Sequence, residues 1–241
     1  MTPPYAVVSG GTRGMGLAFS RRLARLGYDV VALYRDDDVA AAKAGLRAER
    51  VDVSDPDAVS AAADRLLAEH GPPAVLVNNA GINIDKPFLE LGVEDWRRVL
   101  DVNLSGVFYL TRAFAPAMVS GGGRHVVVNV GATTGIRPRR DGANYCASKA
   151  GLLQLTKCLA LELAPRIRVN CLIPGNTETD ELVERFGLAD PDTRERFLAD
   201  VPLGRTADVE EVADALEFLV GEHSAFLTGQ KLIVDGGQFM W

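Results

Sequence analysis

Two residues suited to proton transfer, Tyr145 and Lys149, lie four positions apart in the run YCASK, residues 145–149. In a helix this spacing puts both side chains on one face. A phenol has a pKa of about 10, so it exchanges protons poorly near neutral pH unless a cation stabilises its anion. Because Lys149 can supply that charge, the pair predicts an acid–base site. The alternative is an exposed tyrosine beside a solvated lysine.

A second motif with chemical meaning is the glycine-rich run SGGTRGMG, residues 9–16, which follows an apolar run and precedes a helical pattern. Glycines in this place let the backbone turn sharply and approach a pyrophosphate. The anion is then met by amide N–H groups and by the positive end of the helix dipole. The spacing G-x-x-x-G-x-G therefore predicts a dinucleotide-binding loop, with a plain tight turn as the alternative.

Two further polar sites follow apolar runs. Asp52 and Val53 close the expected third strand, and the run NNAG, residues 78–81, follows the fourth. In an open parallel sheet, ligands bind at the carboxyl ends of the strands. Both segments are therefore expected to line the cofactor crevice, although NNAG could also be only a polar loop.

The elements that must position these groups alternate along the chain. Short β-branched runs are expected as strands, and segments with apolar residues at three- and four-residue spacing as helices. This alternation predicts an α/β fold: one domain over residues 1–241, with a Rossmann-like, doubly wound, seven-stranded parallel sheet covered by helices on both faces. The expected strands are 6–8, 30–33, 51–53, 75–77, 125–130, 169–173 and 231–234, and the main helices 17–26, 59–67, 96–118, 146–163 and 209–220.

Residues 177–202 interrupt the alternation with a charged segment that contains Pro191 and Pro202. The segment is too polar for the core and too long for a tight loop. Long insertions in compact α/β domains are usually functional, so a mobile substrate lid with short helices is expected here.

Composition narrows the classes of function. The chain has 241 residues, 47% apolar residues and a net charge of −6, which disfavours a nucleic-acid surface. No apolar run approaches the roughly 20 residues that span a bilayer, and the N-terminal sequence lacks signal-peptide features, so a cytoplasmic protein without membrane contact is expected. The three cysteines and three histidines have no metal-binding spacing, and no metal is predicted.

These motifs together resemble the short-chain dehydrogenase/reductase family, and the resemblance covers essentially the whole chain. It is carried by the glycine loop, NNAG, Asn103, Tyr145 with Lys149, and Pro174-Gly175. Among the subfamilies the chain is most similar to the β-ketoacyl-ACP reductases, through the segments 143–145, 174–179 and 228–237.

The resemblance implies roles for individual residues. Tyr145 would donate a proton to the substrate carbonyl. Lys149 would lower the Tyr145 pKa and hold the nicotinamide ribose, and Asn103 would anchor a proton-relaying water. The residues that would bind the cofactor are Gly10, Thr12, Arg13, Gly14, Met15, Gly16, Tyr34, Arg35, Asp52, Val53, Asn79, Ala80, Gly81, Tyr145, Lys149, Pro174, Gly175, Thr177 and Thr179.

The end of the second strand indicates which dinucleotide binds. An NAD site usually has an acid there for the ribose 2′-hydroxyl, whereas a 2′-phosphate needs cations. In this chain Tyr34 stands where the family usually carries that acid, and Arg35 and Arg13 can bracket a phosphate. NADP(H) is therefore predicted over NAD(H). The acids at 36–38 count against a phosphate there, the alternative being that they only solvate the turn.

One position departs from the family pattern. The serine that normally lies thirteen residues before the tyrosine, and that binds the substrate oxygen, is replaced by Ala132. Losing such a donor typically costs about 10²- to 10³-fold in rate. Three explanations are open: Thr133 or Thr134 takes over, the substrate supplies its own hydroxyl, or catalysis is weakened. Thr133 is the preferred candidate.

The predicted function is NADPH-dependent reduction of a ketone to a secondary alcohol, the ketone being a β-ketoacyl thioester or a polyketide-like intermediate. One alternative is an NAD(P)-dependent alcohol dehydrogenase acting on a sugar, steroid or cyclic alcohol. Another is a nucleotide-binding protein of this family with weakened or no redox activity.

The resemblance and the charge pattern also suggest partners. The basic stretch RPRR, residues 137–140, could receive an acyl carrier protein or a CoA phosphate, or could be only a solvated loop. Family relatives assemble through two helices and the last strand, so a homo-oligomer is expected, a tetramer or otherwise a dimer.

Overall fold

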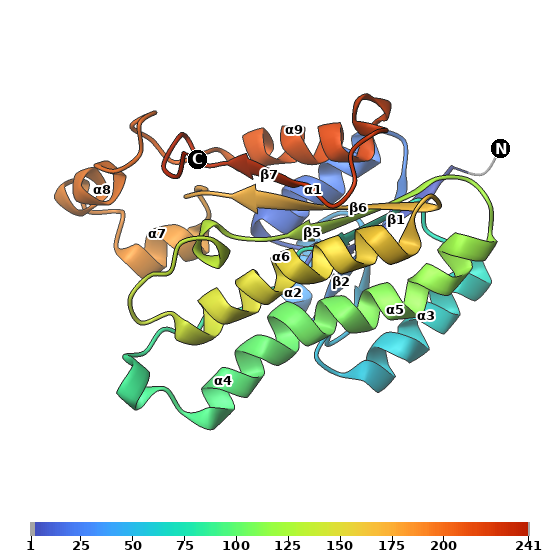
Figure 1. The fold of residues 1–241 in the computed structure, drawn as a ribbon, viewed down its shortest axis with the longest axis horizontal. Helices are drawn as coiled ribbons and strands as arrows, with labels where there is room; N and C mark the ends of the chain where they lie inside the picture. Colours follow the sequence, from blue (N-terminus) through green and yellow to red (C-terminus); the bar gives the residue numbers. More distant parts are fainter. Residues whose placement is uncertain (1–2, 241) are drawn as a thin grey trace.

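The sheet forms the centre of the protein. The computed structural model describes residues 3–240, and within them seven parallel strands lie in the order β3-β2-β1-β4-β5-β6-β7 (Figure 1). The order reverses between β1 and β4, which pair directly. This doubly wound sheet confirms the fold class predicted from the sequence. The strands are β1 (Tyr5–Ser9), β2 (Asp29–Tyr34), β3 (Arg47–Arg50), β4 (Val75–Asn78), β5 (His125–Val130), β6 (Ile167–Pro174) and β7 (Lys231–Val234).

Helices cover both faces of the sheet. On one face α1 and α9 pack together, and their buried apolar residues form a core with β1, β4 and β5. On the other face α3, α5 and α6 build a second core that includes Phe114 and Met118 (Figure 1). The helices are α1 (Gly14–Arg25), α2 (Asp38–Lys43), α3 (Pro56–His70), α4 (Val93–Leu100), α5 (Gly106–Ser120), α6 (Ala143–Leu163), α7 (Asp180–Phe186), α8 (Pro191–Leu198) and α9 (Val209–Val220).

The third strand was predicted at the wrong residues. The apolar run 51–53 follows the strand, whereas β3 itself is the polar segment Arg47–Arg50. β3 lies at the edge of the sheet, where its side chains are partly or fully exposed, so an apolar sequence is not required. Val51 and Val53 lie after the end of the strand and are buried. Their apolar side chains therefore indicated a buried segment, not a segment that pairs with β2.

The long helix predicted over 96–118 is present but locally widened. α4 continues through a π-helical segment, Asp101–Ser105, directly into α5. Such π-bulges often occur at functional sites because they change the direction of one turn of side chains. Here the widened turn contains Asn103.

The charged segment 177–202 carries two short helices, α7 and α8, near the carboxyl end of β6 (Figure 1). A side chain caps the N-terminus of each helix: Thr179 accepts a hydrogen bond from the Leu182 amide at 3.2 Å, and Asp190 accepts one from the Thr193 amide at 2.9 Å. That the segment 177–202 moves as a lid stays a prediction. Within residues 3–240, no helix combines the length and the apolar character needed to cross a membrane.

Buried amides join the two central strands to the helices below the site. Asn78 of β4 donates to Asn129 of β5 at 2.8 Å and to Thr111 of α5 at 3.1 Å. Asn129 in turn donates to Thr156 of α6 at 2.9 Å. Since these side chains are at most 1% exposed, each bond replaces one that water would otherwise make. The network fixes the register of the strands that end at the candidate site.

Replacing Asn129 by alanine should lower the free energy of unfolding by about 1–3 kcal/mol, because the amide of Asn78 and the hydroxyl of Thr156 each lose a buried partner. Urea unfolding followed by circular dichroism measures this. The exposed amide variant Gln230→Ala should change stability by less than about 0.5 kcal/mol. Equal effects of the two substitutions would contradict a stabilising role for the network.

Candidate active site at the carboxyl ends of the strands

The glycine loop between β1 and α1 requires close backbone approach. A methyl group added at Gly16 would lie 1.9 Å from the Gly10 carbonyl oxygen, and Gly10 itself has a positive φ of 62°. The N-terminus of α1 has no side-chain cap at Arg13 and no acid in its first turn. Free amide N–H groups and the positive helix end therefore face the space where a pyrophosphate would bind.

The loop after β4 is clamped to the glycine loop. The backbone amides of Asn79 and Ala80 both donate to the Ser9 hydroxyl at 3.0 Å. The Asn79 side chain donates to the carbonyls of Ser9 at 3.0 Å and Gly10 at 3.1 Å. The predicted cofactor residues of the two loops are thus adjacent, and the side chain of Asn79 holds the loop.

Tyr145 and Lys149 face the same crevice from the first turns of α6. The Lys149 Nζ lies 5.7 Å from the centroid of the Tyr145 ring and donates to the Val130 carbonyl at 2.8 Å. A methyl group at Gly81 would lie 3.7 Å from this Nζ and 3.4 Å from Oδ1 of Asn103. The predicted acid–base pair therefore lies against the NNAG loop, where the open backbone of Gly81 leaves room.

Burial acts on the two groups in opposite directions. It raises the pKa of Tyr145 to about 12, and the charges of Arg139 and Arg185 oppose that rise. It lowers the pKa of Lys149 to about 8. In both cases removal from water disfavours the charged form. That Lys149 lowers the Tyr145 pKa stays a prediction for the cofactor-bound protein.

Asn103 is fully buried in the π-helical segment. Its side chain accepts from the Ile82 amide at 2.8 Å and donates to the Ile82 carbonyl at 2.9 Å and to Ser148 at 3.2 Å. These bonds tie the widened turn to the NNAG loop and to α6. Its role in holding a relay water stays a prediction.

The position that usually carries serine is occupied by Ala132, directly after β5. The short 3₁₀-helix Thr133–Gly135 follows and packs against the backbone of Lys149, as the contacts of Gly135 show. Among the described residues, Oγ1 of Thr134 is buried without a hydrogen-bond partner. Thr133 is partly buried, and its carbonyl closes the turn. Both hydroxyls thus lie close in sequence to the predicted donor position, with none at 132 itself.

Three arginines gather at the end of β2, one more than the sequence had indicated. Arg35 forms an ion pair with Asp36 at 2.7 Å. The pKa of Asp36 is lowered by its hydrogen bond to Arg35 and by the charges of Arg13 and Arg50. Arg50, at the end of β3, donates to the Arg35 carbonyl at 2.8 Å. The neighbouring Tyr34 has a raised pKa because it lies beside the Asp38 carboxylate.

Asp52 and Val53, two of the predicted cofactor residues, are the second and third residues after β3. The Asp52 carboxylate accepts from the amide of Ser54 at 2.9 Å and from its hydroxyl at 2.6 Å. Val53 is buried, and a methyl group at Gly106 of α5 would lie 2.9 Å from its carbonyl oxygen. The Asp52 side chain thus stabilises the turn at Ser54, while Val53 lies against α5.

At the other end, β6 leads into the charged segment. The Gly175 amide donates to the Val234 carbonyl at 2.8 Å, and the buried Thr177 forms a bridge to Ala207. A methyl group at Gly14 would lie 3.7 Å from Cγ2 of Thr179, the cap of α7. Of the predicted cofactor residues after β6, Thr179 thus lies beside the glycine loop.

The basic stretch 137–140 does not form one free patch. Arg139 pairs with Asp85, with the closest N–O distance 2.5 Å, and the Arg137 guanidinium lies 5.3 Å from the centre of the Phe239 ring. Arg140 is exposed. Since Arg139 is engaged inside the site, fewer charges face outward than the sequence suggested.

Sequence reasoning missed Asp85, Arg185 and Arg50. Asp85 pairs with both Arg139 and Arg185, and the latter lies 100 residues away in the chain. No local pattern links residues so far apart. Arg50 carried a usable signal, because it ends the strand next to β2 and so lies beside Arg35.

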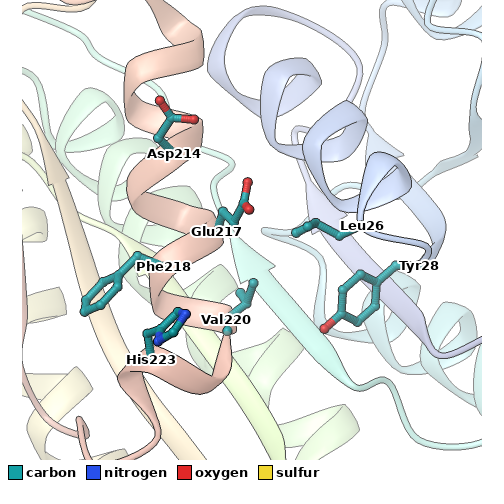
Figure 2. Close-up of a pocket in the computed structure, with 8 residues that line it drawn as sticks. Leu26, Tyr28, Asp214, Glu217, Phe218, Val220 and His223 are labelled. Atoms are coloured by element: carbon teal, nitrogen blue, oxygen red, sulfur yellow. The ribbon is translucent and has the colours of Figure 1, made fainter.

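A further hollow of about 530 Å³ lies between the end of α1 and α9, lined by Leu26, Tyr28, Phe218 and others (Figure 2). It lies near the start of β2, at the amino ends of the strands, whereas the crevice lies at their carboxyl ends. Its acids, Asp214 and Glu217, are engaged by Arg22.

Comparisons with known proteins identify the family. Residues 10–238 match the family described as enoyl-(acyl carrier protein) reductase. The chain is 37% identical to 3beta-hydroxysteroid dehydrogenase 1 of Eggerthella lenta, over 98% of this chain and 93% of that protein. It is also 37% identical to the 3-oxoacyl-(acyl-carrier-protein) reductase FabG of Escherichia coli, over 98% and 97%.

Among solved structures, the ligand-free aldohexose dehydrogenase of Thermoplasma acidophilum is similar with a TM-score of 0.92 and 30% identity, covering 98% of this chain and 94% of that one. A matching fold, near full-length relatives and the tyrosine–lysine pair beside a glycine loop lead to one conclusion. The chain belongs to the short-chain dehydrogenase/reductase family.

Proposed function

We propose that the protein reduces the ketone of a β-ketoacyl thioester to a secondary alcohol with NADPH. The observation that carries this proposal is the position of Tyr145 and Lys149, 5.7 Å apart from ring centroid to Nζ, beside the loop that includes Gly81. The 37% identity to a 3-oxoacyl-(acyl-carrier-protein) reductase supports the thioester ketone as substrate class.

The cofactor fits the residues that would hold it. The uncapped N-terminus of α1 and the close approach of Gly16 to Gly10 leave a backbone cradle for a pyrophosphate. When bound, the reduced nicotinamide supplies a hydride to the carbonyl carbon. The carbonyl oxygen then takes the phenolic proton of Tyr145, so the ketone is reduced and the dinucleotide oxidised. Lys149 would hold the ribose and restore the proton through the path at Asn103.

The buried environment of Tyr145 suits a proton donor. With a pKa raised to about 12, the phenol stays protonated at neutral pH, which is the form needed for reduction. Reduction then slows as the pH rises through the pKa of Tyr145 in the cofactor complex, because the donor is lost.

Arg13, Arg35 and Arg50 support NADP(H) over NAD(H). All three charges act on Asp36, at the place where a ribose 2′-phosphate would lie. A phosphate would find charge-assisted donors there, whereas an unphosphorylated ribose would leave three cations around a single acid. The remaining cofactor residues are proposed as the family pattern implies.

The same proposal includes the carrier of the substrate, the cellular location and the oligomeric state. The thioester is carried by an acyl carrier protein or by CoA, with Arg137 and Arg140 the exposed cations of the stretch 137–140. We propose a cytoplasmic homo-oligomer, a tetramer or otherwise a dimer, as the general preference for closed symmetric assemblies suggests.

Purified protein should oxidise NADPH with a β-ketoacyl thioester faster than with a steroid ketone, and it should oxidise an aldohexose with NADP⁺ only slowly. The Tyr145→Phe variant should lose about 10²- to 10⁴-fold in turnover, because the proton donor is removed. Absorbance of the reduced nicotinamide follows each reaction.

The matched control is Tyr109→Phe, a partly buried tyrosine of α5 outside the crevice, which should keep the parent activity. Full turnover by Tyr145→Phe would refute the mechanism. Faster turnover of the steroid or the sugar would transfer the assignment to the corresponding alcohol dehydrogenase. NADPH binding without any turnover would favour a protein that binds the nucleotide without redox activity.

The variant Arg35→Ala should raise the KM for NADPH about 10- to 100-fold with little change for NADH, because a charge-assisted bond to the 2′-phosphate is lost. Steady-state kinetics with both nucleotides measure this. Arg21→Ala, an exposed position on α1, is the control and should change neither constant. Equal losses with both nucleotides would contradict recognition of the 2′-phosphate.

We further propose that Thr133 donates to the substrate oxygen in place of the missing serine. Thr133→Val should then lower kcat about 10²-fold, as expected for one oxyanion donor. Thr134→Val is the matched comparison, since its buried hydroxyl has no partner among the described residues. A larger loss in Thr134→Val would reassign the donor, and no loss in either would exclude both threonines.

A further inference from the structure

An ion-pair cluster lies against Tyr145 and joins three separate segments. Asp85 follows the NNAG loop, Arg139 lies between β5 and α6, and Arg185 belongs to α7. Arg139 reaches both carboxylate oxygens of Asp85, at 2.7 and 2.5 Å, and Arg185 contacts one of them. One acid therefore serves two cations, which leaves a net positive charge beside the catalytic tyrosine.

Arg139 is as near to Tyr145 as Lys149 is. The Arg139 Cζ lies 5.7 Å from the ring centroid, the same separation as the Lys149 Nζ. The charged or titratable groups that act on the phenol come from the α6 helix, the loop before it and α7: Arg139, Arg185, Glu181, Cys146 and Lys149. Arg139 and Arg185 have the largest effect in favour of the phenolate, and Glu181 and Cys146 act against it.

Contacts from several directions hold the Arg139 side chain in place. Besides Asp85, it donates to the Asn83 side chain at 3.1 Å, and a methyl group at Gly142 would lie 3.0 Å from its Cζ. The loop that carries Asp85 is itself fixed, because Asn144 donates to the Ile84 carbonyl at 3.0 Å. A cation held this firmly needs little reorganisation when charge develops beside it.

The same site lacks a donor that the family usually has. At position 132 an alanine replaces the serine, so no hydroxyl there can bind the substrate oxygen while Tyr145 transfers its proton. A fixed cation can favour the same proton transfer by stabilising the phenolate instead, since its field needs no direct contact with the substrate oxygen.

We propose that Arg139, held by Asp85 and supported by Arg185, is a positioning residue that acts electrostatically on Tyr145 and offsets the missing hydroxyl at position 132. This inference rests on the proposed reduction by Tyr145. Asp85 sets the strength of the effect, because its carboxylate partly neutralises the two arginines. It also joins the lid helix α7 to the body of the protein.

Two variants of the cluster should shift the alkaline limb of the pH profile of kcat/KM in opposite directions. Arg139→Gln removes a cation, which raises the Tyr145 pKa and shifts the alkaline limb of kcat/KM to higher pH. Its kcat/KM at neutral pH should fall about 10²-fold. Asp85→Asn leaves the arginines less neutralised, so the limb should move to lower pH. Arg21→Gln, which removes an equal charge at an exposed position of α1, should leave the profile unchanged.

A double-mutant cycle tests the link to position 132. If Arg139 offsets the missing hydroxyl, Ala132→Ser should raise kcat/KM at least about tenfold in the Arg139→Gln background and much less in the parent. Additive effects would overturn that link. A shift of both cluster variants in the same direction, or no shift, would overturn the electrostatic role and leave only a structural one.

A readout without turnover separates this inference from the proposed function. In protein labelled with ¹³C at the tyrosine ζ carbon, the Tyr145 resonance is identified by its loss in Tyr145→Phe. At one alkaline pH at which the fold is kept, the phenolate fraction should be lower in Arg139→Gln and higher in Asp85→Asn than in the parent. If no ketone is reduced but these shifts occur, only the function fails. If ketones are reduced without these shifts, only the inference fails.

Discussion

The site depends on one junction, where the chain reverses its direction of winding between β1 and β4. Ser9 ends β1, and its hydroxyl accepts the amides of Asn79 and Ala80 after β4, while Asn79 donates back to the glycine loop. In a doubly wound sheet the flanking connections leave in opposite directions at this point, which opens a crevice. The hydrogen bonds fix the two walls of that crevice, and Asn103 and Lys149 then contact the same NNAG loop from α4–α5 and α6.

Removal of charge from water dominates the electrostatics of the crevice. The phenol of Tyr145 and the ammonium of Lys149 are both pushed toward their neutral forms, which keeps the first as a proton donor but opposes the cationic form that the proposed chemistry needs of the second. The Val130 carbonyl satisfies the ammonium directly. Arg139 and Arg185 lower the pKa of Tyr145 against the effect of burial, and they come from outside the sequence motif that identifies the pair.

Polar contacts also connect the charged segment 177–202 to the rest of the protein. Arg185 pairs with Asp85 near Tyr145, and Glu178 accepts from Thr206 at 2.6 Å, while the pair of Arg194 with Glu178 at 2.7 Å lies within the segment. These side chains are partly exposed, so each pair contributes modestly to stability. The pair of Arg185 with Asp85 ties α7 to the loop after β4, and the cap of α7, Thr179, lies beside the glycine loop.

Much of this architecture could be predicted from local sequence. Apolar runs such as 125–130 indicate strands that are buried on both faces of a sheet, so the sheet could be predicted from them. The glycines at 10 and 16 indicate a turn in which the backbone leaves no room for a side chain, so the glycine loop of the crevice could be predicted as well. The polar edge strand β3 could not be found this way, because its position depends on pairing with β2 and not on burial. The π-helical turn at Asn103 and the pairing of Asp85 with Arg185 required the tertiary structure. Both arise from contacts between segments distant in the chain, and local periodicity carries no information about such contacts.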